Sequence, residues 1–180
     1  KAHRGKCVVI VGEFQPPVVH ALGYAINEAL GNRNETISFT QPLEAFPVDE
    51  VQSIRDLTAS MNAGKVKTLL ILGGNPVYDA PADLNFGEAL KKVKTRIHLT
   101  AYNNETSIVC QWQLPEAHFL ETWGDTRAYD GTVTVQQPLI APLYGGKTAI
   151  EILAALAGNA GKSAHDLVKE YWTARLGENN

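Results

Sequence analysis

The fold class follows from VKTLLILGGNP, residues 66–76. Val66–Leu72 (VKTLLIL) has the clearest strand pattern in the sequence. The run ends at Gly73-Gly74-Asn75-Pro76, and glycine and proline are the residues that most often interrupt regular structure. This stretch therefore predicts a buried strand that leads into a tight loop.

Segments that read as strands and helices alternate on both sides of this stretch. Strands are predicted at Lys6–Gly12, Thr36–Thr40 and Arg96–Thr100. Helices are predicted from Val18 to Gly31, and over Val51–Ala63 and Leu84–Lys92, where apolar residues recur at helical spacing. A succession of βα units predicts a Rossmann-like α/β fold, a three-layer domain with a mainly parallel sheet.

The second half of the chain gives a weaker pattern. Gln111–Tyr144 is rich in Trp, Pro and Gly and reads as irregular, before helices return at Thr148–Ala157 and Ser163–Arg175. A chain of 180 residues with 44% hydrophobic residues can bury one substantial core. We expect one domain over residues 1–158, with residues 159–180 as a helical extension of that domain.

Charge and hydropathy exclude several classes of partner. The net charge is -3 and the sequence pI is near 6.0, without a cluster of Lys or Arg, so we expect no nucleic acid partner. The apolar runs are shorter than the roughly 20 residues that a bilayer span needs. No signal-peptide pattern opens the sequence. We therefore expect a soluble fragment that does not itself span the membrane.

The chain has two cysteines, Cys7 and Cys110. Neither has a second thiol or a histidine at zinc-ligand spacing, and two thiols cannot hold an iron–sulfur cluster alone. A disulfide between them is one interpretation. We favour free buried thiols, because Cys7 falls in an apolar run where a thiol behaves as a small hydrophobe.

Loops that follow the strands are the candidate ligand sites. In open parallel sheets ligands bind beyond the carboxyl ends of the strands, which here are followed by Gly12–Gln15 and Gly73–Pro76. Glycines allow close approach to backbone amides that can face a phosphate, and Asn75 offers both a donor and an acceptor. The alternative is a simple turn, since Gly, Asn and Pro are all turn formers. Neither GxGxxG nor GxxxxGK[ST] occurs in the sequence.

No residue carries a clear catalytic signature. The histidines lack paired spacing and are expected at the surface or satisfied in the core, and no GxSxG occurs. Carboxylates cluster near Trp112 and Trp123 and allow two interpretations, glycosidic chemistry or, as we favour, acceptors for turns and backbone amides. These carboxylates are Glu116, Glu121, Asp125 and Asp130. Glycosylation sequons at Asn34 and Asn104 are short enough to occur by chance. We predict no catalytic residue and no metal ligand.

Several short motifs occur in a familiar order. They are LLILGGNP at 69–76, NET at 104–106, QLP at 113–115, Glu121, DGTVT at 130–134 and EIL at 151–153. The stretch Val66–Ala157 thereby resembles the third domain of the molybdopterin oxidoreductases, the dimethyl-sulfoxide-reductase and formate-dehydrogenase superfamily. Upstream, Gly12–Gln15, Ala25–Asn27 and Leu30–Asn32 resemble the opening strand and helix of the same domain.

Two segments, 112–125 and 137–146, are most similar to one branch of this superfamily. That branch is the molybdopterin-oxidoreductase-like subunit of alternative complex III, a bacterial quinol-oxidising respiratory assembly. The resemblance implies a parent on the periplasmic face of the cytoplasmic membrane. It also implies other domains of the parent chain, partner iron–sulfur, cytochrome and membrane subunits, and iron–sulfur clusters outside this fragment.

The sequence departs from the cofactor-binding relatives after the DGT motif. Those relatives continue with Asn and an Arg-containing segment, where this chain has Val135-Gln136-Gln137-Pro138 and lacks a cationic fork for an anionic cofactor. The alternative complex III branch is understood to have lost the molybdenum cofactor. We therefore expect a non-catalytic scaffold domain without a cofactor of its own.

Two alternatives to the scaffold stay open. In the first, the parent is an active oxidoreductase with molybdopterin guanine dinucleotide. The family resemblance would then place Gly12, Gln15, Gly73, Gly74, Asn75 and Pro76 along the cofactor. In the second, the chain is a stand-alone small-molecule-binding module that uses the same crevice at the ends of the strands.

Overall fold

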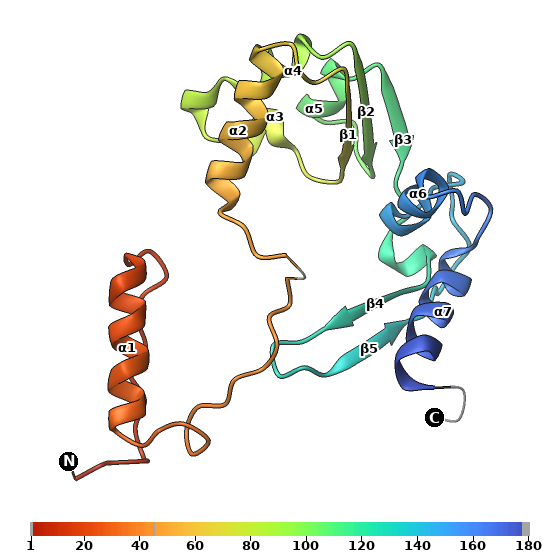
Figure 1. The fold of residues 1–180 in the computed structure, drawn as a ribbon. Coiled ribbons are helices and arrows are strands. Elements are labelled where there is room, and N and C mark those ends of the chain that lie inside the picture. Colours follow the sequence, from red (N-terminus) through yellow and green to blue (C-terminus); the bar gives the residue numbers. More distant parts are fainter. Residues whose placement is uncertain (1, 45, 178–180) are drawn as a thin grey trace. The chain divides into compact units, whose positions relative to one another are not determined.

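The computed structural model describes residues 2–44 and 46–177 (Figure 1). The chain divides into two compact units. The first is Lys1–Leu43 with Tyr129–Gly131, and the second is Glu44–Ala128 with Thr132–Asn180. The predicted boundary between residues 158 and 159 stays a prediction.

Helix α1, Pro17–Ala29, is the main element of the first unit. Pro16 and Pro17 stand at its start, where a missing N–H costs no helical hydrogen bond. The preceding segment lies against the helix: the Asn27 side chain accepts from the Val9 N–H at 2.9 Å and donates to the Val9 carbonyl at 2.8 Å. A Cβ at Gly23 would overlap with Val11 Cγ2, so only glycine allows this close approach.

The strand predicted at Lys6–Gly12 is wrong. Within the described residues, this segment belongs to no β-ladder, and Val8 and Ile10 are 49% and 83% exposed. The Asn27 amide takes both backbone groups of Val9, which a neighbouring strand would otherwise bind. The strand predicted at Thr36–Thr40 is also wrong, because only an isolated bridge between Arg33 and Ile37 forms nearby.

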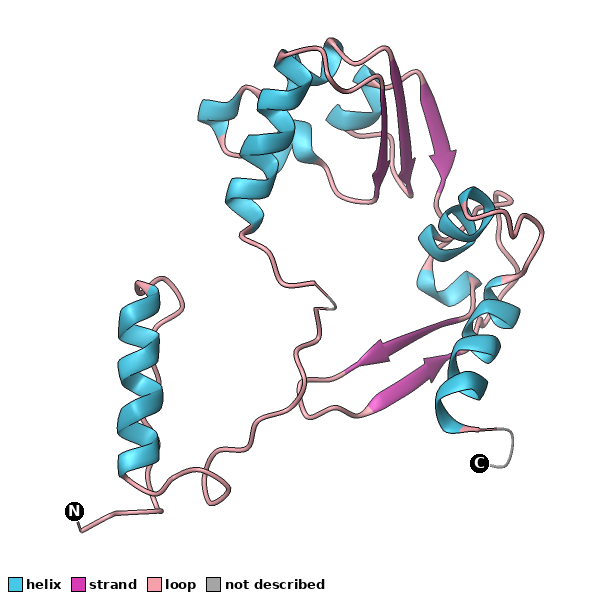
Figure 2. Ribbon diagram, viewed as in Figure 1, coloured by secondary structure: helices cyan, strands magenta, loops and turns pink. Residues whose placement is uncertain are grey.

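A parallel three-stranded sheet, in the order β1-β2-β3, organises the second unit (Figure 2). Its strands are β1 Thr68–Leu72, β2 Thr95–Thr100 and β3 Trp112–Pro115. The short helices α3 Pro76–Asp79 and α4 Phe86–Lys91 connect β1 to β2, and α5 Glu105–Val109 connects β2 to β3. The predicted α/β class with a parallel sheet is confirmed, although β3 was not expected from the sequence.

The buried core of this unit lies between the sheet and its helices. Helix α2, Glu50–Asn62, is capped by Asp49, whose side chain accepts from the Gln52 N–H at 2.9 Å. Leu69 and Ile71 of β1 pack against a cluster of fully or nearly fully buried side chains. The cluster consists of Met61, Phe86, Ala89, Leu90 and Val93.

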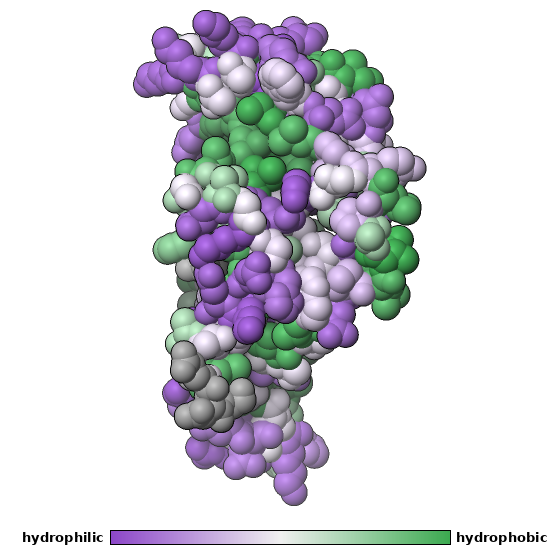
Figure 3. Space-filling model, turned by 90° about the vertical axis from the view of Figure 1, so that its right-hand side faces the viewer, coloured by the Kyte–Doolittle hydropathy of each residue, from purple (hydrophilic) through white to green (hydrophobic). Residues whose placement is uncertain are grey.

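The opposite face of the sheet is less covered. Side chains alternate along a strand, so Leu70 and Leu72 point away from the face that carries Leu69 and Ile71. Leu72 is 36% exposed, and Trp112 of β3 is 62% exposed. Hydrophobic surface, drawn in green, is visible at the level of the sheet in Figure 3.

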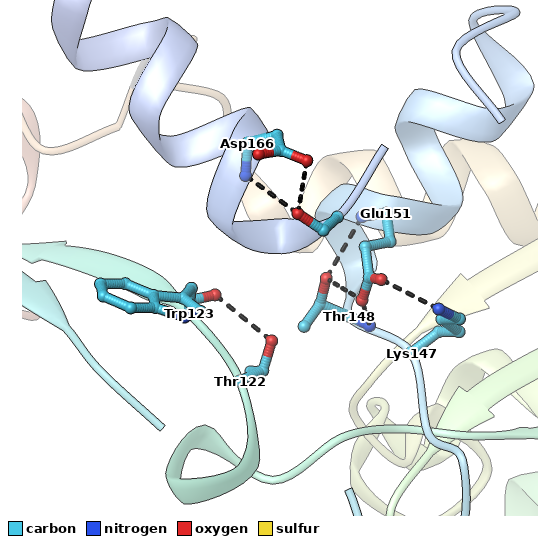
Figure 4. A network of polar contacts seen from close by, with 7 residues as sticks. Thr122, Trp123, Lys147, Thr148, Glu151 and Asp166 are labelled. Carbon is cyan, nitrogen blue, oxygen red and sulfur yellow. Dashed lines mark hydrogen bonds and ion pairs between the residues drawn. The ribbon is translucent and has the colours of Figure 1, made fainter. Parts of the chain in front are cut away.

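The rest of the second unit follows β3. Strands β4 Gly124–Arg127 and β5 Val133–Gln136 form an antiparallel hairpin within the segment predicted to be irregular. Helices α6 Ala149–Leu156 and α7 Ala164–Leu176 confirm the two predicted C-terminal helices. A reciprocal capping box starts α6: the Glu151 N–H donates to Thr148 Oγ1 at 3.2 Å, and Glu151 accepts from the Thr148 N–H at 2.9 Å (Figure 4).

None of the helices in the described part of the chain combines the length and the apolar character needed to cross a membrane.

Candidate functional site

The carboxyl ends of the three parallel strands lie at one edge of the sheet. The register pairs Leu72 with Leu99, and Thr100 with Pro115, so the loops that follow the strands start at similar positions. Gly73–Pro76 follows β1, residues 101–104 follow β2, and Glu116 follows β3. This edge is where ligands bind in open α/β sheets.

The loop Gly73–Pro76 has a backbone that requires its glycines. Gly73 and Gly74 both have φ +70, a left-handed conformation that side-chain-bearing residues rarely adopt. The Gly73 N–H donates to the Leu99 carbonyl at 2.8 Å and thereby continues the ladder beyond β1. Within the described residues, the Gly74 and Asn75 N–H groups make no such bond, so two backbone donors remain available.

The Asn75 side chain makes three hydrogen bonds within the fold. Its Oδ1 accepts from the Thr106 N–H at 3.1 Å and from Thr106 Oγ1 at 2.8 Å. Its Nδ2 donates to Glu105 Oε2 at 2.6 Å. Thr106 is completely buried, and its Oγ1 also accepts from the Val77 N–H at 3.0 Å. The amide that seemed most suited to a ligand thus joins the loop to α5.

His98 of β2 supports the same loop from inside the sheet. The side chain is completely buried, with Nδ1 3.1 Å from Ser107 Oγ and Nε2 3.1 Å from the Gly74 carbonyl oxygen. Because a carbonyl only accepts, Nε2 carries a proton. The prediction of a satisfied core histidine holds for His98. Its link to the loop was not foreseen, because it joins residues 24 positions apart.

Two carboxylates face this loop. A Cβ built on Gly73 would lie 3.9 Å from Glu116 Oε2. The hydrogen bond from Asn75 to Glu105 holds the pKa of that carboxyl below its ordinary value, so Glu105 stays ionised at neutral pH. Neither carboxylate forms an ion pair with the described Lys, Arg and His residues. The edge of the sheet is therefore negative at this point.

The other predicted loop residues lie in the first unit. Gly12 and Gln15 form a turn in which the Gln15 N–H donates to the Gly12 carbonyl at 3.1 Å. Phe14 in this turn is 96% exposed. Gly12 and Gln15 thus belong to the first unit, whereas Gly73–Pro76 belongs to the second, and the grouping of these six residues as one site stays a prediction.

A hollow of about 590 Å³ in the first unit is lined by Tyr24, Ala25, Glu28, Arg33 and Phe39. The Arg33 guanidinium lies 6.0 Å from the centre of the Phe39 ring and pairs with Glu28 at 3.9 Å. Its aromatic rings and its charged groups are largely exposed. The hollow holds no buried polar group that would select a ligand.

Two of the remaining carboxylates serve structural roles. Glu121 accepts from the His118 N–H at 3.0 Å and from the Leu143 N–H at 3.2 Å. Asp125 accepts from the Trp172 indole at 2.6 Å. For Glu121 this confirms the interpretation as an acceptor for backbone amides. Among residues 2–44 and 46–177, no group of three or more His, Cys, Asp or Glu could hold a metal ion.

Comparisons with known proteins agree with this α/β fold. No family model matches the chain. The chain is 32% identical over 107 residues to the menaquinone reductase molybdopterin-binding-like subunit of Nitratidesulfovibrio vulgaris, a match that covers 57% of this chain and 16% of that subunit. Acetylene hydratase from Pelobacter acetylenicus is similar in structure, with a TM-score of 0.50, 20% identity, and coverage of 59% of this chain and 16% of the hydratase.

The sequence match supports the resemblance to the molybdopterin oxidoreductases, and the structural match shows a shared fold. Each match spans only 16% of the length of the relative.

Proposed function

We propose that this chain is a scaffold domain of a large molybdopterin-oxidoreductase-type subunit in a respiratory, quinone-linked electron-transfer complex. The observation that carries the proposal is the engagement of Asn75, whose three hydrogen bonds all go to Glu105 and Thr106. A side chain committed in this way stabilises the domain, and its carbonyl oxygen and one of its two amide N–H donors are not available to a cofactor.

The similarity to a subunit of a menaquinone reductase supports a role in quinone-linked electron transfer. The more specific proposal is a parent of the alternative complex III type on the periplasmic face of the cytoplasmic membrane. Its partners would be the other domains of the same chain and iron–sulfur, cytochrome and membrane subunits. Iron–sulfur clusters would lie outside these 180 residues.

One observation favours the alternative, a molybdopterin-dinucleotide-binding domain of an active oxidoreductase. The free N–H groups of Gly74 and Asn75 are donors of the kind that bind phosphate oxygens. Glu116 and Glu105 oppose this function, since they bring negative charge to the same loop. In this version the cofactor would supply the redox chemistry, and Gly12, Gln15 and Gly73–Pro76 would bind it.

The decisive experiment is cofactor analysis of the full-length parent purified from its own membrane. Metal analysis and the fluorescence of oxidised pterin are measured on the same sample. We expect iron and haem in the complex, without stoichiometric molybdenum, tungsten or pterin. Stoichiometric molybdenum or tungsten together with pterin would overturn the scaffold and establish the cofactor-binding alternative.

A further inference from the structure

The loop Gly73–Pro76 combines free donors with open space. The N–H groups of Gly74 and Asn75 are unpaired among the described residues. A Cβ on Gly74 would meet only Pro76 Cδ, at 4.0 Å. Successive free backbone amides in a glycine loop attract anions in many proteins. The geometry of the backbone alone would therefore admit a phosphate.

The Glu116 carboxylate places a negative charge beside these backbone N–H donors. Its Oε2 would be 3.9 Å from a Cβ on Gly73, and within the described residues no hydrogen bond or ion pair neutralises it. Glu105, held by Asn75 at 2.6 Å, adds a second negative charge. An anion at the loop amides would be repelled by both carboxylates, and this repulsion is weakened only partly by solvent near a protein surface.

The position of Glu116 is fixed by its backbone. Its N–H donates to the Thr100 carbonyl at 3.0 Å, and the next N–H, of Ala117, donates to the Lys147 carbonyl at 3.0 Å. A Cβ on Gly146 would lie only 2.8 Å from Ala117 N, so residue 146 must be glycine for this strand end to pack. The backbone from which the carboxylate extends is thus held by both neighbouring segments.

We propose that Glu116 is a specificity-determining residue that excludes anionic ligands, such as the diphosphate of a dinucleotide, from the amides of Gly73–Pro76. This inference rests on the proposed scaffold function and supplies a physical reason for it. The loop has the backbone of a phosphate-binding turn, but the Glu116 carboxylate after β3 prevents a phosphate from binding there.

The test is a titration of the full 180-residue chain with inorganic pyrophosphate, followed by the amide NMR signals of Gly74 and Asn75. We expect no saturable shift for the natural chain at millimolar pyrophosphate. Glu116→Gln should increase the affinity at least tenfold, because it removes the charge and keeps the shape. The matched control is Glu50→Gln, which removes an exposed carboxylate from α2 in the same unit.

The inference is overturned if the natural chain binds pyrophosphate at these amides, or if Glu116→Gln binds no more tightly than Glu50→Gln. Glu116→Ala provides a second variant should the glutamine variant not keep the native amide spectrum. Cofactor analysis of the parent tests the scaffold function separately. Pterin in the parent would reject the scaffold, whereas failure of Glu116→Gln to gain affinity would reject only the role of Glu116.

Discussion

At the scale of single residues, Asn75 shows how a turn motif becomes part of a tertiary contact. The side chain joins the end of β1 to the start of α5, across 31 positions of sequence to Thr106. His98 adds a second link between the same elements through Ser107 and the Gly74 carbonyl. Buried polar groups are costly when left without partners, so these contacts are expected to depend on one another.

Replacing Asn75 should therefore destabilise the second unit. Asn75→Ala leaves the buried Thr106 hydroxyl without its acceptor, and we expect a loss of about 1–3 kcal/mol in the free energy of unfolding. Urea unfolding measures the change. Asn103→Ala, at an exposed neighbour of α5, is the matched control and should change the free energy by less than about 0.5 kcal/mol. Equal effects of the two variants would contradict the role given to Asn75.

The surroundings of the Cys110 thiol change its pKa in a direction that can be measured. Both cysteines are free, as predicted, although they are half-buried rather than fully buried. Burial raises the pKa of Cys110 above its ordinary value, against the opposing effect of Arg96, so less of this thiol is ionised at neutral pH.

A thiol reagent should detect the raised pKa of Cys110. We expect Cys110 to react with 5,5′-dithiobis(2-nitrobenzoate) more slowly at pH 7.5 than a freely exposed thiol does. As the pH is raised, the reaction rate of the exposed thiol should level off first, and the rate of Cys110 should level off only at a higher pH. The Cys7→Ser variant isolates the signal of Cys110, and a small thiol peptide serves as the reference. A rate for Cys110 equal to that of the peptide at all pH values would contradict the assignment.

At the scale of elements, the capping box at the start of α6 should make the stability of the fold depend on pH. Burial raises the pKa of Glu151, but hydrogen bonds from the Thr148 backbone, Lys147 and Thr148 outweigh it, and the pKa falls below its ordinary value of 4.5. A lowered pKa in the folded state means that the ionised carboxylate stabilises the fold. This stabilisation is present above pH 4.5 and is lost as the pH falls through the folded-state pKa.

Glu151→Gln should remove this pH dependence while keeping part of the capping geometry. We expect a lower melting temperature than that of the natural chain at pH 7, and a difference that shrinks as the pH falls below 4.5. Thr148→Ala should cost about 0.5–2 kcal/mol at pH 7, since it removes the N-cap oxygen. Thermal unfolding followed by circular dichroism measures both variants. A difference between Glu151→Gln and the natural chain that stays constant down to pH 3 would refute the contribution of the carboxylate.

The elements that were predicted correctly are those with a strong local pattern. The apolar run ending at Gly73 identified β1, and regular apolar spacing identified α2. Lys6–Gly12 also has a strand pattern, but a strand needs a neighbouring strand to pair with, and a local sequence pattern does not show whether one is present. The hairpin β4–β5 was missed because its strands are short and polar, although Asp130-Gly131 is a typical turn signal.

The candidate site was predicted only in part, for a related reason. The loop after β1 follows from the sequence, because parallel strands end at a common edge. Thr106, His98 and Glu116 meet this loop through contacts between distant parts of the chain. No local motif specifies which side chain from β2, β3 or α5 will face Gly73–Pro76. The order of the motifs was recognised from the resemblance to a family. The negative charge of Glu105 and Glu116 beside the loop became visible only in the structure.

At the scale of the whole molecule, much apolar surface remains exposed. The segment 139–144 is the clearest case: Leu139, Leu143 and Tyr144 are 76%, 69% and 84% exposed. The segment is nevertheless held in place, since the Leu139 N–H donates to the Leu120 carbonyl at 2.7 Å and the Leu143 N–H donates to Glu121 at 3.2 Å. Soluble monomeric proteins rarely expose large contiguous apolar patches, which commonly mark interaction surfaces.

If the chain is a scaffold domain, this segment should bind a hydrophobic dye when the 180-residue chain is isolated and should be covered within the parent complex. We expect the isolated chain to raise the fluorescence of 8-anilinonaphthalene-1-sulfonate, and Leu139→Ser with Leu143→Ser to lower that signal without changing the circular dichroism spectrum. Hydroxyl-radical labelling of Leu143 and Tyr144 should be strong in the isolated chain and weak in the purified complex. Equal labelling in both samples would show that the segment stays exposed in the complex. Contact with a neighbouring domain or subunit would then not explain its apolar side chains.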